Sequence, residues 1–152
     1  MLEIVAVVGF VVILAAVQVK RTRNRNELER HSISPEDLHN LLASHQDVAL
    51  FDVRLPLDML SRSVVIPGAM RLAPEEVVAN PSLIPSDRDS IVYCTCPSDK
   101  TSRTVLLRAR SKGILRIRFL KGGLAGWISS GFPVEPYDKP FHLSQSKDAL
   151  AT

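Results

Sequence analysis

A cysteine at the end of a predicted strand is the most reactive candidate side chain of this chain. Cys96 follows an apolar, β-rich run over residues 90–95 and opens a polar loop over residues 96–101, after which Ser102 begins a predicted helix. A thiol at a strand-to-helix turn faces unpaired backbone N–H groups, and these donors and the helix dipole favour the thiolate. The same donors can hold an anionic group. The pattern therefore predicts cysteine chemistry on a small anion.

The chain has two cysteines, Cys94 and Cys96. Two thiols separated by one residue cannot join distant parts of a fold, and we expect their side chains to point to opposite faces of the strand. A structural zinc site would need two further ligands, and the four histidines are scattered without ligand spacing. We therefore expect no metal, and the cysteine pattern favours a reducing compartment.

The charge of the chain is unevenly distributed. The 152 residues, enough for one domain of ordinary size, carry a net charge of +3, and aromatic residues make up 5%. Basic residues crowd one short stretch: Lys20, Arg21, Arg23, Arg25 and Arg30. Because no basic stripe with interleaved aromatic residues is present, the composition argues against nucleic-acid binding.

The N-terminal segment is apolar. Residues 4–19 contain no charge, and a membrane-spanning helix needs roughly 17–25 apolar residues. A cleaved signal peptide would carry positive charge before the apolar stretch, but here Glu3 precedes it and the basic cluster follows. We expect an uncleaved anchor over residues 1–19 and a basic juxtamembrane linker over residues 20–32. The positive-inside rule then predicts a single-pass protein of the inner (cell) membrane, with its C-terminal domain in the cytoplasm.

The remaining sequence alternates predicted strands with predicted helices. Ser34 and Pro35, followed by two acidic residues, indicate the start of a helix. The alternation favours an α/β domain with a mostly parallel central sheet flanked by helices. In such sheets reactive groups belong at the carboxyl ends of the strands, and both Asp52 and Cys96 fall there.

Five ordered motifs carry a family resemblance. They are Asp52-Val53-Arg54, Ile66-Pro67-Gly68-Ala69, the run from Val92 to Cys96, the Gly-Gly-x-x-x-Trp pattern from Gly122 to Trp127, and Gly131-Phe132-Pro133-Val134. In this order and at compatible spacing they resemble a single-domain rhodanese, a member of the sulfurtransferase family. The resemblance implies a rhodanese-like domain over residues 33–137, with a flexible C-terminal tail over residues 138–152.

The resemblance also indicates which cysteine is the nucleophile. The family places a Ser or Thr six residues after the catalytic Cys, and counting back from Ser102 gives Cys96. From Cys94 the loop would be two residues too long. Cys94 is then a supporting strand residue, although it can act as a resolving thiol if a sulfur or an oxidant lands on Cys96.

The resemblance implies a two-step reaction. The Cys96 thiolate takes the sulfane sulfur of thiosulfate or a related anionic donor, sulfite leaves, and a thiol or cyanide acceptor then removes the sulfur from the Cys96 persulfide. The loop residues that would bind the donor are Pro97, Ser98, Asp99, Lys100, Thr101 and Ser102. Ser102 would cap its helix and Lys100 would attract the donor. Asp52 and Arg54 would support the loop as a pair, with direct contact between Arg54 and the donor as the alternative. No metal or organic cofactor is needed, and no protein partner is indicated.

Two departures from the common loop, Cys-x-x-Gly-x-Arg-Ser, keep other functions open. Asp99 replaces the Gly and Thr101 replaces the Arg, so a non-catalytic or persulfide-carrying binding module at the membrane is an alternative. A cysteine phosphatase or arsenate reductase is a weaker one. It would need Arg at position 102 to grip its oxyanion, and Arg103 stands one place too late.

Overall fold

The computed structural model describes residues 2–138. The chain divides into two compact units, one within residues 1–32 and one within residues 33–152. The catalytic candidates all belong to the second unit. The predicted flexible tail over residues 138–152 lies, except for Asp138, outside the described residues.

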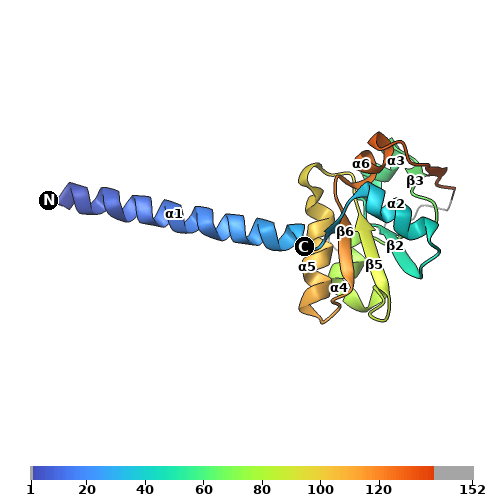
Figure 1. Ribbon diagram of the computed structural model, residues 1–152, viewed down its shortest axis with the longest axis horizontal. Helices are drawn as coiled ribbons and strands as arrows, with labels where there is room; N and C mark the ends of the chain where they lie inside the picture. Colours follow the sequence, from blue (N-terminus) through green and yellow to red (C-terminus); the bar gives the residue numbers. More distant parts are fainter. Residues whose placement is uncertain (1, 139–152) are drawn as a thin grey trace, which may run out of the picture. The chain divides into compact units, whose positions relative to one another are not determined.

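A five-stranded sheet forms the centre of the second unit, in the order β1-β6-β5-β2-β4 (Figure 1). Its strands are β1 (Ser32–Ile33), β2 (Val48–Asp52), β4 (Met70–Arg71), β5 (Asp89–Tyr93) and β6 (Ile117–Leu120). β5 pairs in parallel with both β2 and β6, and β2 pairs in parallel with β4. In the β2–β5 register Asp52 lies opposite Tyr93, so both strands end at the same edge of the sheet. The predicted mostly parallel α/β sheet is confirmed.

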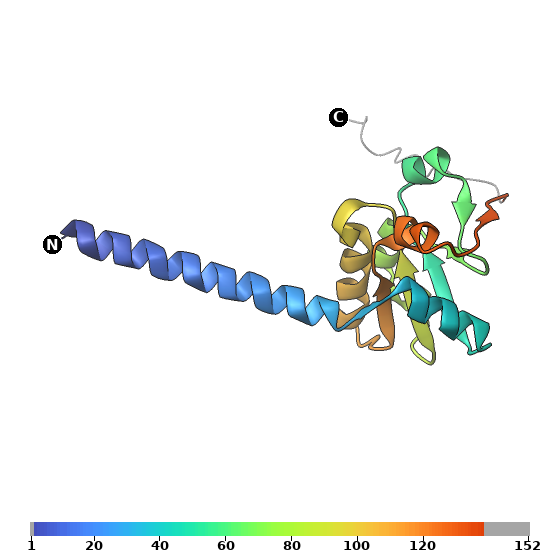
Figure 2. The same ribbon diagram turned by 45° about the horizontal axis from the view of Figure 1, so that its top comes forward.

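Helices cover both faces of this sheet (Figure 2). They are α2 (Pro35–Ala43), α3 (Pro56–Ser61), α4 (Pro74–Ala79), α5 (Lys100–Ser111) and α6 (Gly123–Ser129), with short 3-10 turns at Pro81–Leu83 and Pro97–Asp99. As predicted, Ser34 caps α2, because its hydroxyl oxygen accepts the Asp37 N–H at 3.1 Å. The sequence did not indicate β1, nor the small antiparallel pair of β3 (Val64–Val65) and β7 (Glu135–Pro136).

The core follows from the alternation of side chains along the strands. Ile91 and Tyr93 of β5 project to one face, where they pack with Leu38 of α2 and Trp127 of α6. On the other face α5 packs against β5 and β6. Burying each large apolar side chain contributes roughly 1.5–3 kcal/mol, so the two packed layers hold the strand ends, and the loops that follow them, in fixed positions.

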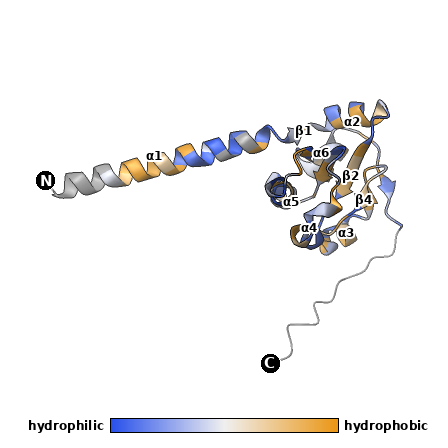
Figure 3. Ribbon diagram, turned by 90° about the horizontal axis from the view of Figure 1, so that it is seen from below, coloured by the Kyte–Doolittle hydropathy of each residue, from blue (hydrophilic) through white to orange (hydrophobic). Residues whose placement is uncertain are grey.

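The first unit contains one helix, α1 (Leu2–Glu29). Residues 20–29, predicted as a linker, continue this helix because their Lys, Arg, Glu and Leu residues favour helix formation. Within the described part of the chain, no helix combines the length and the apolar character that crossing a bilayer requires. In Figure 3 the coloured part of α1 changes from mainly hydrophobic to mainly hydrophilic toward Glu29. The predicted transmembrane anchor is therefore not supported, and the predicted cellular location stays a prediction.

Candidate active site

The loop after β5 brings the predicted nucleophile over the start of α5. β5 ends at Tyr93, a 3-10 turn covers Pro97–Asp99, and α5 begins at Lys100. Ser98 and Asp99 adopt left-handed backbone conformations, with φ of 61° and 55°. Two consecutive residues of this kind turn the chain sharply. The turn places the first residues of α5 against the side chain of Cys96.

Thr101 stabilises the thiolate form of Cys96. The Thr101 backbone N–H donates to Cys96 Sγ at 3.3 Å, and the Thr101 hydroxyl oxygen lies 3.5 Å from the same sulfur. Burial opposes ionisation of Cys96, but the hydrogen bonds from Cys94 and Thr101 outweigh it and lower its pKa below the ordinary value. Cys96 is half-buried, so a small molecule can reach it.

Cys94 lies directly beside the nucleophile. Its Sγ is 2.8 Å from Cys96 Sγ, and both cysteines are free. The expectation that the two side chains point to opposite faces is therefore wrong, because residues two apart in an extended chain share a face. Burial, followed by the hydrogen bond with Cys96, raises the pKa of Cys94 to about 11. At neutral pH Cys94 is thus the proton donor of the pair.

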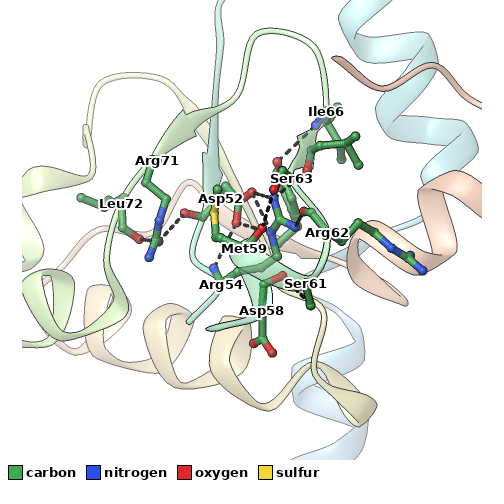
Figure 4. A network of polar contacts seen from close by, with 12 residues as sticks. Asp52, Arg54, Asp58, Met59, Ser61, Arg62, Ser63, Ile66, Arg71 and Leu72 are labelled. Atoms are coloured by element: carbon green, nitrogen blue, oxygen red, sulfur yellow. Dashed lines mark hydrogen bonds and ion pairs between the residues drawn. The ribbon is translucent and has the colours of Figure 1, made fainter. Parts of the chain in front are cut away.

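Asp52 and Arg54 form a buried ion pair at the end of β2 (Figure 4). Arg54 Nη2 lies 2.6 Å from Asp52 Oδ2, and the two side chains are 0% and 1% exposed. Arg54 also donates to the carbonyls of Arg62 at 2.9 Å and Val64 at 2.7 Å. Breaking such a buried pair costs about 3–5 kcal/mol. Through the contacts of Arg54 with the Arg62 and Val64 carbonyls, the pair fixes the segment after α3. Because the Arg54 side chain is fully buried, it has no exposed surface with which to bind a donor.

A cleft beside the cysteines was not predicted. It is lined by Asp58, Ser61, Arg62, Thr95 and Ala125. Thr95 separates the two cysteines in sequence, so the cleft reaches the strand end that carries them. Figure 4 shows the Arg62 side chain pointing away from the buried ion pair. No sequence signal marks Arg62, because its place depends on how α3 ends and on the carbonyl contact that it makes with Arg54.

The comparisons with known proteins agree with this arrangement. The family model described as the rhodanese-like domain matches residues 34–130. A curated protein named sulfurtransferase, from Allochromatium vinosum, is 31% identical over 104 residues, which cover 68% of this chain and 94% of that protein. The chain belongs to the rhodanese-like domain family.

Solved structures of similar proteins extend the match. The Alr3790 protein from Anabaena sp. is 31% identical, and the match covers 68% of this chain and 82% of that chain with a TM-score of 0.57. A protein from Lactobacillus plantarum, 19% identical, covers 78% of this chain and 98% of that chain with a TM-score of 0.64. This second likeness concerns the fold alone.

The rhodanese loop of this chain departs from the common pattern at Asp99, and the structure explains how. The Asp99 side chain is buried, and its Oδ2 accepts the backbone N–H of Gly122 at 3.0 Å. Asp tolerates the left-handed conformation better than most residues, so it can replace the Gly. The carboxylate then ties the active-site loop to the turn before α6, a contact that Gly cannot make.

The remaining loop residues fill different places. Lys100 is exposed at the first position of α5, whereas Ser102 is fully buried. The predicted cap by Ser102 is wrong, because the N-cap position of α5 is Asp99. The Ser102 hydroxyl has no hydrogen-bond partner in the part of the chain that the structure describes. Pro97 has no N–H, so it cannot serve as a backbone donor.

Proposed function

We propose that this rhodanese-like protein is a sulfurtransferase that moves sulfane sulfur through a Cys96 persulfide. The observation that carries the proposal is the contact between Cys96 Sγ and the Thr101 N–H at 3.3 Å. Burial opposes ionisation of the thiol, but the hydrogen bonds from Cys94, the Thr101 hydroxyl and this N–H together lower its pKa. The relative named sulfurtransferase supports the same chemistry. Thiosulfate is the proposed donor because its charge suits a site with positively polarised N–H groups.

The reaction proceeds in two displacements. The Cys96 thiolate attacks the outer sulfur of thiosulfate, the sulfur–sulfur bond of the donor breaks, and sulfite leaves with the bonding electrons. Cys96 then carries a persulfide. A thiol or cyanide attacks the outer sulfur of the persulfide and returns Cys96 as the thiolate.

Two cations are placed to attract the donor. Lys100 is exposed at the start of α5, and Arg62 lines the cleft beside Thr95. Neither replaces the loop Arg of the family, since Thr101 stands at that position. We propose that Arg62 and Lys100 share the task of holding the sulfonate oxygens of thiosulfate, while Arg54 supports the fold.

The phosphatase alternative lacks its anion-gripping residue. Position 102 is a buried Ser, and the Arg103 guanidinium lies over the Phe119 ring, 5.1 Å from its centre. A planar guanidinium fork at the loop is what phosphate binding requires. The alternative of a persulfide carrier without turnover differs from the proposal only in the second displacement.

The test is to weigh the reduced full-length protein after exposure to thiosulfate, together with Cys96→Ser and Cys94→Ser forms. We expect Cys94→Ser, and the native protein when it is weighed immediately after mixing, to take up one sulfur atom, and Cys96→Ser to take up none. Thiocyanate should appear when cyanide is added to a loaded protein. Loading without thiocyanate indicates the carrier, and uptake that survives in Cys96→Ser contradicts the assignment of the nucleophile.

A further inference from the structure

The two cysteines are placed to react with each other. Cys94 Sγ and Cys96 Sγ are 2.8 Å apart and unbonded. A short closing movement brings them to the S–S bonding distance of about 2.05 Å. Cys94 helps to lower the pKa of Cys96, but a hydroxyl donor could do the same, and the two displacements by external molecules need no second thiol. A thiol at this position makes a further step possible.

A persulfide on Cys96 can be attacked from two sides. Cys94 is 1% exposed, whereas Cys96 is half-buried. An external acceptor reaches the outer sulfur of a Cys96 persulfide from the open side. Cys94 instead touches the inner sulfur, Sγ, from the protein interior. An attack at Sγ expels the outer sulfur toward the open side of the site.

The backbone keeps Cys94 in place for this attack. Its carbonyl oxygen accepts the Leu124 N–H at 2.9 Å, and Gly123 lies so close to that carbonyl that it has no room for a Cβ. Cys96, in contrast, belongs to the loop before α5. The different pKa values of the pair suit the two roles, because Cys96 ionises first and Cys94 keeps its proton until the persulfide has formed.

We propose that Cys94 resolves the Cys96 persulfide, releasing hydrosulfide and leaving a Cys94–Cys96 disulfide. The inference rests on the proposed function and names the first acceptor as a thiol of the protein itself. The Cys94 Sγ–Cys96 Sγ bond forms, and the bond from Cys96 Sγ to the outer sulfur breaks. The outer sulfur departs with the electron pair, and it takes up the Cys94 proton as hydrosulfide. The sulfane sulfur gains two electrons, and the two cysteines lose them.

The product of this step defines the external co-substrate. A disulfide must be reduced before the site can accept sulfur again, and thiol–disulfide exchange with a dithiol does this through a mixed disulfide. The second substrate of the complete cycle is therefore a dithiol reductant, small or protein-borne. The overall reaction converts thiosulfate and a dithiol into sulfite, hydrosulfide and a disulfide.

The experiment uses a single turnover without reductant. The reduced full-length protein is mixed with thiosulfate, freed of donor by rapid desalting, and sampled over time for hydrosulfide and for intact mass. In parallel, inorganic polysulfide loads Cys96 without requiring recognition of thiosulfate. Cys94→Ser is the matched variant, because its hydroxyl keeps a hydrogen-bond donor beside Cys96 but is a poor nucleophile at neutral pH.

We expect the native protein to release one hydrosulfide per chain and to end lighter than the reduced protein by two hydrogen atoms, with the disulfide in the peptide that spans both cysteines. The Cys94→Ser protein should keep its added sulfur until an external thiol is supplied. A native persulfide as long-lived as that of Cys94→Ser overturns the inference and leaves the proposed function standing. Failure of thiosulfate to load either form, with hydrosulfide release after polysulfide, overturns the proposed donor and supports the resolving role of Cys94.

Discussion

Thr101 stands where the common rhodanese loop carries Arg, and it turns both its N–H and its hydroxyl toward Cys96 Sγ. An Arg at this position would add a charge to the loop, whereas Thr adds a short donor that acts on the nucleophile itself. With Thr in place of Arg, the loop loses a positive charge that could attract an anionic donor and gains a hydroxyl that stabilises the Cys96 thiolate. In the function that we propose, donor binding then depends on Lys100 and Arg62.

Replacing Thr101 by Val removes the hydroxyl and keeps the backbone N–H. Because the hydroxyl helps to lower the pKa of Cys96, we expect Thr101→Val to raise that pKa. Alkylation of Cys96 by iodoacetamide, followed over pH in a Cys94→Ser background, should show its midpoint at higher pH in Thr101→Val. Thr101→Ser, which keeps the hydroxyl, is the control. Equal midpoints for the Val and Ser forms would show that the hydroxyl does not support the thiolate.

The contact between the end of β5 and the start of α6 belongs to the scale of elements. Gly123 has a φ of +53°, and a Cβ there would collide with the carbonyl oxygen of Cys94. Leu124 donates its N–H to the same carbonyl at 2.9 Å. The close approach of α6 thus sets the position of the strand end on which both cysteines depend.

Gly123→Ala should therefore be far more damaging than an ordinary substitution of a left-handed glycine. Gly113, with a φ of +84° and open space around its Cα, is the matched control. Gly113→Ala carries only the backbone strain, about 1–2 kcal/mol, and Gly123→Ala adds the collision. Urea unfolding of both variants measures the difference. Equal losses of stability would mean that α6 shifts freely to accommodate the methyl group.

The sequence predicted the elements that have strong local signals. The cap at Ser34, the parallel alternation and the strand-end position of Cys96 depend on patterns within a few residues. The contacts of Asp99 with Gly122 and the place of Arg62 in the cleft join segments far apart in sequence, so no local pattern indicates them. The two-residue strands β1, β3 and β7 are too short to show a period. The proximity of the two cysteines, in contrast, follows from strand geometry and was missed by a wrong assignment of faces.

For the whole molecule, the division into two units makes a direct prediction. The catalytic candidates and the core that positions them lie within residues 33–152. We expect a chain that lacks residues 1–31 to unfold at the same Tm and to load sulfur as the full chain does. Differential scanning calorimetry and the thiosulfate mass assay check this. A lower Tm or a loss of sulfur loading on removal of α1 would show that the helix contributes to the folded domain.

The left-handed pair Ser98 and Asp99 has a consequence for the donor recognition that we propose. Holding a non-glycine residue in this conformation costs about 1–2 kcal/mol, and that cost is met during folding, with the help of the Asp99–Gly122 bond. The loop over residues 96–101 therefore has its shape before a donor binds, and binding costs little conformational entropy for ordering it. A rigid loop discriminates between ligands by how well they fit its shape. For the proposed function, we therefore expect selectivity among sulfur donors to be set by the size and shape of the anionic head group, and we expect a loop with glycine in place of Asp99 to admit a wider range of donors.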